Sequence, residues 1–99
     1  MSPVTKATVI ATLQRDRPTL EKMGVRSLLL FGSVARNQAH DQSDIDLLVE
    51  LEKHCSLFDL FRVRRYLETQ FDRAIDLGTI DALREHAREP ILEESIHVF

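Results

Sequence analysis

The stretch Leu28–Val49, LLLFGSVARNQAHDQSDIDLLV, joins two apolar segments through a polar one. Its first part belongs to the apolar run 25–31, which is long enough for a buried strand. A Gly-Ser pair ends that run, and residues 34–36 predict one or two turns of helix. The segment 43–49 then resumes an extended, mostly apolar pattern. The stretch therefore predicts a strand, a sharp turn, a short helix, a loop and a second strand.

Two acidic residues, Asp44 and Asp46, occupy the second predicted strand. Side chains at positions i and i+2 leave a strand on the same face, here with α-carbons roughly 6–7 Å apart. Two ionised carboxylates at that separation repel each other, and a divalent cation relieves the repulsion. Mg²⁺ prefers a few carboxylates together with phosphate oxygens and water. Two such ions can bind both the attacking and the leaving oxygen of a phosphoryl transfer. The pair therefore predicts a Mg²⁺ site for phosphoryl transfer.

The turn at Gly32 and Ser33 supplies the second half of this predicted site. A glycine lets the backbone approach a phosphate closely, and the free N–H groups at the start of a helix attract anions. Ser33 has a structural alternative as the N-cap of the short helix, which does not exclude phosphate binding. The sequence thus predicts a phosphate site beside the carboxylates.

Together these residues resemble the signature of the polymerase-β-like nucleotidyltransferase superfamily. The resemblance is carried by Gly32-Ser33, by Ala35-Arg36 and by the segment SDID at 43–46. The sequence LFGSVAR…SDIDLLVE is close to that of the minimal nucleotidyltransferases, the MNT group. The resemblance extends from about Leu20 to the end of the chain. A bare DxD pair is a weak signal, whereas GS followed by DxD on the expected elements is a strong one. One departure is Asn37, where the family usually has glycine; asparagine tolerates positive φ better than most residues.

The resemblance implies a function and a partner. Minimal nucleotidyltransferases usually pair with HEPN-domain toxins in prokaryotic toxin–antitoxin systems. By this resemblance the chain would transfer AMP from ATP to a hydroxyl, with Mg²⁺ as cofactor. The implied acceptor is a tyrosine of a HEPN toxin, which the modification silences. ATP and the toxin are then the expected partners, and a hetero-oligomer with the toxin is expected.

The resemblance also implies a third carboxylate, from the short extended segment RAIDL at 73–77. Asp76 matches that position and would bind metal or accept the proton of the attacking hydroxyl, whereas its competitor Asp72 precedes the strand. Each assignment has a structural alternative: a solvated strand face for the first two aspartates, a strand-end polar residue for Asp76, and a surface charge for Arg36. Ser43 is favoured as a residue that orients the loop. The full predicted site has Asp44, Asp46 and Asp76 for metal and catalysis, with Gly32, Ser33, Arg36 and Ser43 for the nucleotide and its outer phosphates.

Composition limits the alternatives. The chain has 99 residues, 43% hydrophobic and 29% charged, which fits one soluble globular domain over 1–99. A net charge of −3 argues against strong non-specific nucleic-acid binding, though not against nucleotide binding. One cysteine, Cys55, excludes an internal disulfide and suits a reducing cytoplasm. The sequence shows neither a signal peptide nor an apolar run that would span a membrane, so a cytoplasmic protein is expected.

The remaining segments complete an α/β fold, a small mixed sheet with helices packed on it. Three strands are expected, which would leave sheet edges for a partner to cover. Ser56 and Asp59 predict a capping box at the start of the longest helix. Helices are expected over 5–14, over a second segment that ends near Met23, over 56–71, from Thr79 or Asp81 to His86, and from Glu89 to Val98.

Two other functions fit the same residues. The chain would act as a binding-only antitoxin if its catalytic site were vestigial, and the full set of carboxylates argues against that. It would otherwise act on RNA ends or on small molecules. Larger superfamily members that do so carry further substrate-binding domains, for which 99 residues leave no room. The base of the nucleotide stays open.

Overall fold

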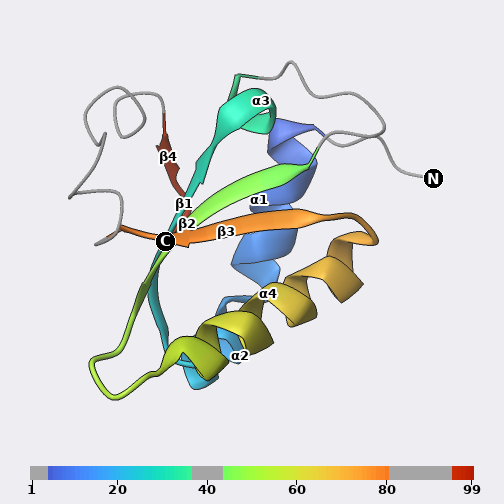
Figure 1. The fold of residues 1–99 in the computed structure, drawn as a ribbon. Coiled ribbons are helices and arrows are strands. Elements are labelled where there is room, and N and C mark those ends of the chain that lie inside the picture. Colours follow the sequence, from blue (N-terminus) through green and yellow to red (C-terminus); the bar gives the residue numbers. More distant parts are fainter. Residues whose placement is uncertain (1–4, 37–43, 81–94) are drawn as a thin grey trace.

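Four strands form one mixed sheet at the centre of the protein (Figure 1). The computed structural model describes residues 5–36, 44–80 and 95–99. The strand order is β3-β2-β1-β4; β2 runs antiparallel to β1 and parallel to β3, and β4 runs antiparallel to β1. The strands are β1 (Val25–Phe31), β2 (Ile45–Leu51), β3 (Ile75–Thr79) and β4 (Ile96–His97). The predicted fold class, α/β with a small mixed sheet, is confirmed.

One face of the sheet carries the hydrophobic core. On β2 the side chains of Ile45, Leu47 and Val49 are fully buried and join residues of the helices in one cluster. Because side chains alternate along a strand, Asp46 and Leu48 belong to the opposite face. The same alternation on β3 places Ile75 in the core cluster and Asp76 on the opposite face, where it is exposed. The sheet therefore keeps its acidic residues apart from its core.

The described residues form four helices, of which α1, α2 and α4 lie together on one side of the sheet in Figure 1. The core cluster takes Val9 and Leu13 from α1, Leu20 from α2 and the pair Val63 and Leu67 from α4. α3 follows β1 directly, contacts β1 and β2, and adds Val34 and Ala35 to the same cluster. Their bounds are α1 (Lys6–Arg15), α2 (Arg17–Lys22), α3 (Gly32–Ala35) and α4 (Leu57–Phe71). Within the described ranges, no helix is long and apolar enough to cross a membrane.

The helix ends are set by local backbone chemistry. Pro18 lies in the first turn of α2, where its missing N–H costs nothing. Gly24 follows that helix with φ 99°, a conformation that favours glycine. At the start of α4 the backbone N–H of Ser56 donates to Asp59 Oδ2 at 2.8 Å, which confirms the predicted capping box. The left-handed conformation of Asp72 ends α4.

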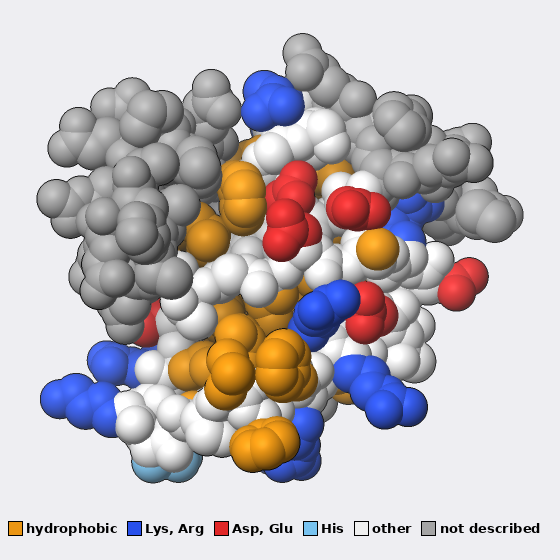
Figure 2. Space-filling model, viewed as in Figure 1, with side chains coloured by type: hydrophobic (Ala, Val, Ile, Leu, Met, Phe, Trp, Pro, Cys, Tyr) orange, Lys and Arg blue, Asp and Glu red, His pale blue; other side chains and the backbone are white. Residues whose placement is uncertain are grey.

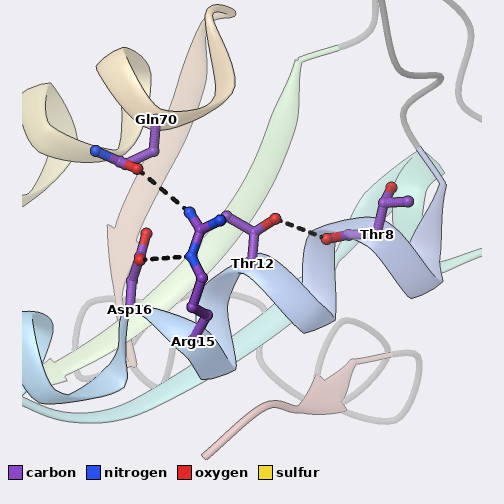
Figure 3. Close-up of polar contacts among 5 residues, drawn as sticks. All are labelled: Thr8, Thr12, Arg15, Asp16 and Gln70. Carbon is purple, nitrogen blue, oxygen red and sulfur yellow. Dashed lines mark hydrogen bonds and ion pairs between the residues drawn. The ribbon is translucent and has the colours of Figure 1, made fainter.

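A polar contact joins the end of α1 to α4 (Figure 3). The Arg15 Nη2 group donates to Gln70 Oε1 at 3.5 Å, and its Nε group pairs with Asp16 Oδ1 at 3.2 Å. The Arg15 side chain is mostly exposed, so the pair adds little stability by itself. The hydrogen bond from Arg15 to Gln70 nevertheless bridges two helices that pack on the same core.

The C-terminal prediction needs correction. The expected helix to Val98 is wrong over its last residues, because Ile96–His97 forms β4 and makes the sheet four-stranded rather than three-stranded. Val98 N donates to the carbonyl of Leu28 at 2.8 Å, and Phe99 is buried. The β-branched residues Ile96 and Val98 favour an extended backbone, and pairing with β1 overrides the helical spacing.

A second correction concerns the third strand, which was expected over 73–77 and therefore without Gly78 and Thr79. Both lie in β3, paired with Leu48 and Val49 of β2. The observed strand therefore begins two residues later than the expected 73–77 and ends two residues later. The helix expected up to His86 and the N-terminal part of the last helix fall outside the described residues.

Candidate active site

Three segments meet at one end of the sheet. Phe31, the last residue of β1, lies opposite Asp46 of β2, and Gly32 follows it directly. Asp46 in turn lies in register with Asp76 of the parallel strand β3. Neighbouring strands are about 4.8 Å apart, so this register places the two carboxylates side by side on the face opposite the core. The turn and two of the predicted carboxylates thus converge.

The electrostatic environment of Asp46 reflects this crowding. The pKa of its carboxyl is raised to about 6, first by burial and then by the Asp76 carboxylate, which acts through repulsion and a side-chain hydrogen bond. The Asp44 carboxylate contributes to this rise, whereas the Arg36 guanidinium opposes it. Asp46 therefore lies in a field of two acids and one cation. A carboxylate held this way gains most from a nearby cation.

Gly32 is required by the close approach of the turn to Asp46. Its φ of 76° lies in the left-handed region, which is costly for residues with a Cβ. A Cβ at this position would also occupy the space of Asp46 Oδ2. The glycine therefore lets the backbone lie directly against the Asp46 carboxylate, and its role in phosphate binding stays a prediction.

The other predicted residues lie around this contact. Ser33 is in the first turn of α3 and partly exposed, and Arg36 ends α3. The alternative of Ser33 as the N-cap is wrong, because Phe31 holds that position. Asp44 precedes β2 by one residue and is exposed, so it is not within the strand as expected. Ser43 and Asn37 lie outside the described residues.

A hollow of about 250 Å³ lies beside the carboxylates. One of its walls is Arg64, which comes from α4 and pairs with Glu68 at 3.7 Å. The two residues are four apart on α4, the spacing at which side chains of opposite charge pair on a helix. Nothing local marks Arg64, because its place depends on how α4 packs beside β3. The hollow is lined by Asp44, Arg64, Ala74, Ile75, Asp76 and Leu77.

A second hollow, of about 330 Å³, lies at the other end of β3. Thr79 lines it together with Leu57 and Leu60 of α4, and it contains none of the predicted site residues. The smaller hollow is therefore the one that bears on the predicted chemistry.

The carboxylates offer suitable donors for Mg²⁺, which prefers hard oxygen ligands. Within residues 5–36, 44–80 and 95–99, no group of three or more Asp, Glu, His or Cys side chains is already arranged around a metal position. Asp46 and Asp76 are nevertheless in hydrogen-bonding contact, and Asp44 is close enough to affect Asp46. A divalent cation would remove the repulsion that raises the pKa of Asp46, so these residues fit the ion.

Asp46 predicts a pH dependence of stability in the metal-free protein. Its folded pKa of about 6 lies above its ordinary value of 3.8, so its contribution is fully present below pH 3.8. That contribution is lost as pH rises through about 6, because the folded protein must then give up a proton that it holds more tightly. In EDTA, wild type should lose about 1 kcal/mol relative to Asp46→Asn between pH 4 and 7.5, after solvent screening.

Thermal melts at the two pH values measure this difference, which corresponds to about 4–8 °C for a domain of this size. Asp46→Asn is the internal control, since every other titrating group remains. Added Mg²⁺ should reverse the loss in wild type at pH 7.5. If the melting temperatures of the two proteins differed by the same amount at every pH, the assignment would be contradicted.

Residues 11–98 match the family described as "Nucleotidyltransferase domain". The chain belongs to this family. Two relatives support the assignment. A Methanocaldococcus jannaschii protein assigned as a protein adenylyltransferase is 38% identical over 82% of this chain and 87% of its own length. The protein adenylyltransferase MntA of Thermococcus cleftensis is 33% identical over 79% of each chain.

Solved structures agree on the fold. A structure assigned as a minimal nucleotidyltransferase has a TM-score of 0.80 and 32% identity, over 93% of this nucleotidyltransferase and 94% of that chain. A chain of a toxin–antitoxin complex with AMP-PNP has a TM-score of 0.68 and 18% identity, and the match covers 95% of this chain and 72% of that chain. A chain from the tri-AMPylated Shewanella oneidensis HEPN toxin in complex with MNT antitoxin has a TM-score of 0.55 and 17% identity. The match covers 87% of this chain and 71% of that chain. The predicted resemblance and enzyme class are confirmed.

Proposed function

We propose that this nucleotidyltransferase transfers AMP from ATP to a tyrosine hydroxyl of a HEPN-domain toxin and thereby acts as its antitoxin. The observation that carries the proposal is the contact of Gly32 with Asp46, beside Asp76 in register. This contact places the turn that would bind phosphate next to the carboxylates that would hold metal. Relatives named protein adenylyltransferases support the reaction. A fold neighbour from an AMPylated HEPN toxin complex supports the partner.

In this proposal the acceptor oxygen forms a bond to the α-phosphorus of ATP, and the bond to the departing pyrophosphate breaks. Asp76 accepts the proton of the hydroxyl. Gly32 and Ser33 bind the β- and γ-phosphates, with Arg36 as a counter-charge and Ser43 in the adjoining loop. Asp44, Asp46 and Asp76 would hold Mg²⁺, which supplies positive charge to the transferring phosphoryl group.

Mass spectrometry tests the reaction and the acceptor together. The purified HEPN partner, incubated with this chain, ATP and Mg²⁺, should gain the mass of AMP on a tyrosine-containing peptide. EDTA should prevent the gain, and the partner with ATP alone is the control. An unmodified partner, despite a stable complex with this chain, would contradict the proposed reaction. Modification at a residue other than tyrosine would correct the acceptor.

A further inference from the structure

Three large apolar side chains at the start of α4 are exposed to solvent. Leu57 is 63% exposed, Phe58 79% and Phe61 52%. Figure 2 shows hydrophobic side chains gathered over α4, on the same face of the molecule as the acidic side chains. An apolar group of this kind next to a site marks an interaction surface more often than a single exposed leucine does. Leu57, Phe58, Phe61 and Arg65 are called the α4 surface below.

The α4 surface is continuous with the candidate active site. Leu57, Phe61 and Arg64 follow the spacing i, i+4 and i+7, so they form one stripe along the helix. Arg64 lines the hollow that also contains Asp44 and Asp76. With a rise of 1.5 Å per residue, Phe61 and Leu57 lie roughly 4.5 and 10 Å along the axis from Arg64. The apolar side chains therefore begin one helical turn from the hollow.

That distance is small compared with the footprint of a protein. A standard interface covers about 800 Å² on each partner, the area of a disc with a radius of roughly 16 Å. A protein whose hydroxyl reaches Asp46 and Asp76 would therefore extend over the start of α4. Covering Phe58 and Phe61 would remove their apolar area from water at the same time.

The charges around these side chains indicate the chemistry of the partner. Arg62 and Arg65 are exposed on the same part of the helix. Arg62 pairs with Asp59 at 3.9 Å, whereas Arg65 makes no ion pair with any residue that the structure describes. The apolar side chains thus have a basic border with unused charge. A complementary surface has apolar residues surrounded by carboxylates.

We propose that the acceptor protein docks on the α4 surface through apolar side chains bordered by acidic residues, with its hydroxyl in the hollow beside Arg64. This inference rests on the proposed function. It adds where the partner binds and what its binding face contains. Arg65 meets a carboxylate of the partner, and Phe58 and Phe61 lie at the centre of the contact.

Titration of the HEPN partner against Phe58→Ser, Phe61→Ser and Arg65→Glu tests the surface. Each variant should weaken the complex by about ten- to thirty-fold, since buried aromatic and arginine side chains dominate interfaces. Their melting temperatures and their affinity for ATP with Mg²⁺ should match wild type, because these side chains are exposed and outside the site. Lys6→Glu, the same charge reversal at an exposed position on α1, is the control.

The outcomes separate this inference from the proposed function. Unchanged partner affinity in both phenylalanine variants overturns the docking surface, whether or not AMP is transferred. Variants that abolish self-association of this chain in sedimentation, but leave partner affinity intact, assign the surface to a second copy and also overturn it. Weakened binding with no AMP transfer by wild type supports the surface and contradicts the proposed reaction.

Discussion

Asp46→Asn is expected to lower AMP transfer by at least about a thousandfold while the protein remains folded. The carboxylate lies between Asp76 and the turn at Gly32, where it would share the metal with its neighbour. The amide keeps the shape and loses the charge. A metal ion contributes several kcal/mol of charge stabilisation to such a reaction, and each 1.36 kcal/mol is about tenfold in rate. Single-turnover transfer to the HEPN partner measures the effect.

Asp72→Asn is the matched control, because it makes the same substitution at an exposed position where asparagine tolerates the left-handed backbone. It should transfer AMP at the wild-type rate. Full activity of Asp46→Asn would show that the pair with Asp76 does not hold the metal. If Asp46→Asn neutralised the toxin completely without any transfer, the binding-only antitoxin would replace the proposed enzyme.

Gly32→Ala should lower transfer by at least about a hundredfold and weaken ATP binding. The added methyl group would displace the Asp46 carboxylate, and φ at this position is 76°. The left-handed backbone alone costs alanine about 1–2 kcal/mol. The displaced carboxylate adds a loss of catalytic geometry, which is severe because a shift of about 1 Å can cost a hundredfold. Calorimetry with ATP and Mg²⁺, together with transfer rates, measures both effects.

Gly78→Ala separates the loss of a glycine from the loss of this contact. Gly78 lies two residues after Asp76 on the same strand, and a methyl group there would meet Leu48 Cδ2 at 3.4 Å. The leucine side chain must move by only a few tenths of an ångström, so activity should stay within about threefold of wild type. Equal losses of transfer activity in Gly32→Ala and Gly78→Ala would mean that activity is lowered by any added methyl group in this sheet, and not by the loss of the Gly32 contact in particular.

The sequence predicted the parts of the site whose geometry is local. A strand that ends in Gly32 needs only its own apolar run and the conformational freedom of glycine. Asp46 belongs to a strand whose alternation can be read directly, and Asp76 follows from the family resemblance. Their register with each other is a finding of the structure, because the sequence placed the two residues in one metal site only through that resemblance.

Features that depend on packing between distant segments were not predicted. Arg64 reaches the hollow only because α4 packs beside β3, which no spacing within α4 reveals. β4 was misread as helix because Ile96 pairs with Leu30, more than sixty residues earlier in the chain. The exposure of Phe58 and Phe61 likewise depends on which side of α4 faces the sheet.

The alternation on β2 and β3 also protects the protein from misfolding. If β2 slipped by one residue against its neighbours, Asp46 would turn into the core and Ile45 and Leu47 would face water. Each unpaired carboxyl group moved into an apolar interior carries a large desolvation cost, and the apolar burial would be lost as well. The acidic residues proposed to bind nucleotide and metal therefore also disfavour any alignment that shifts β2 by an odd number of residues.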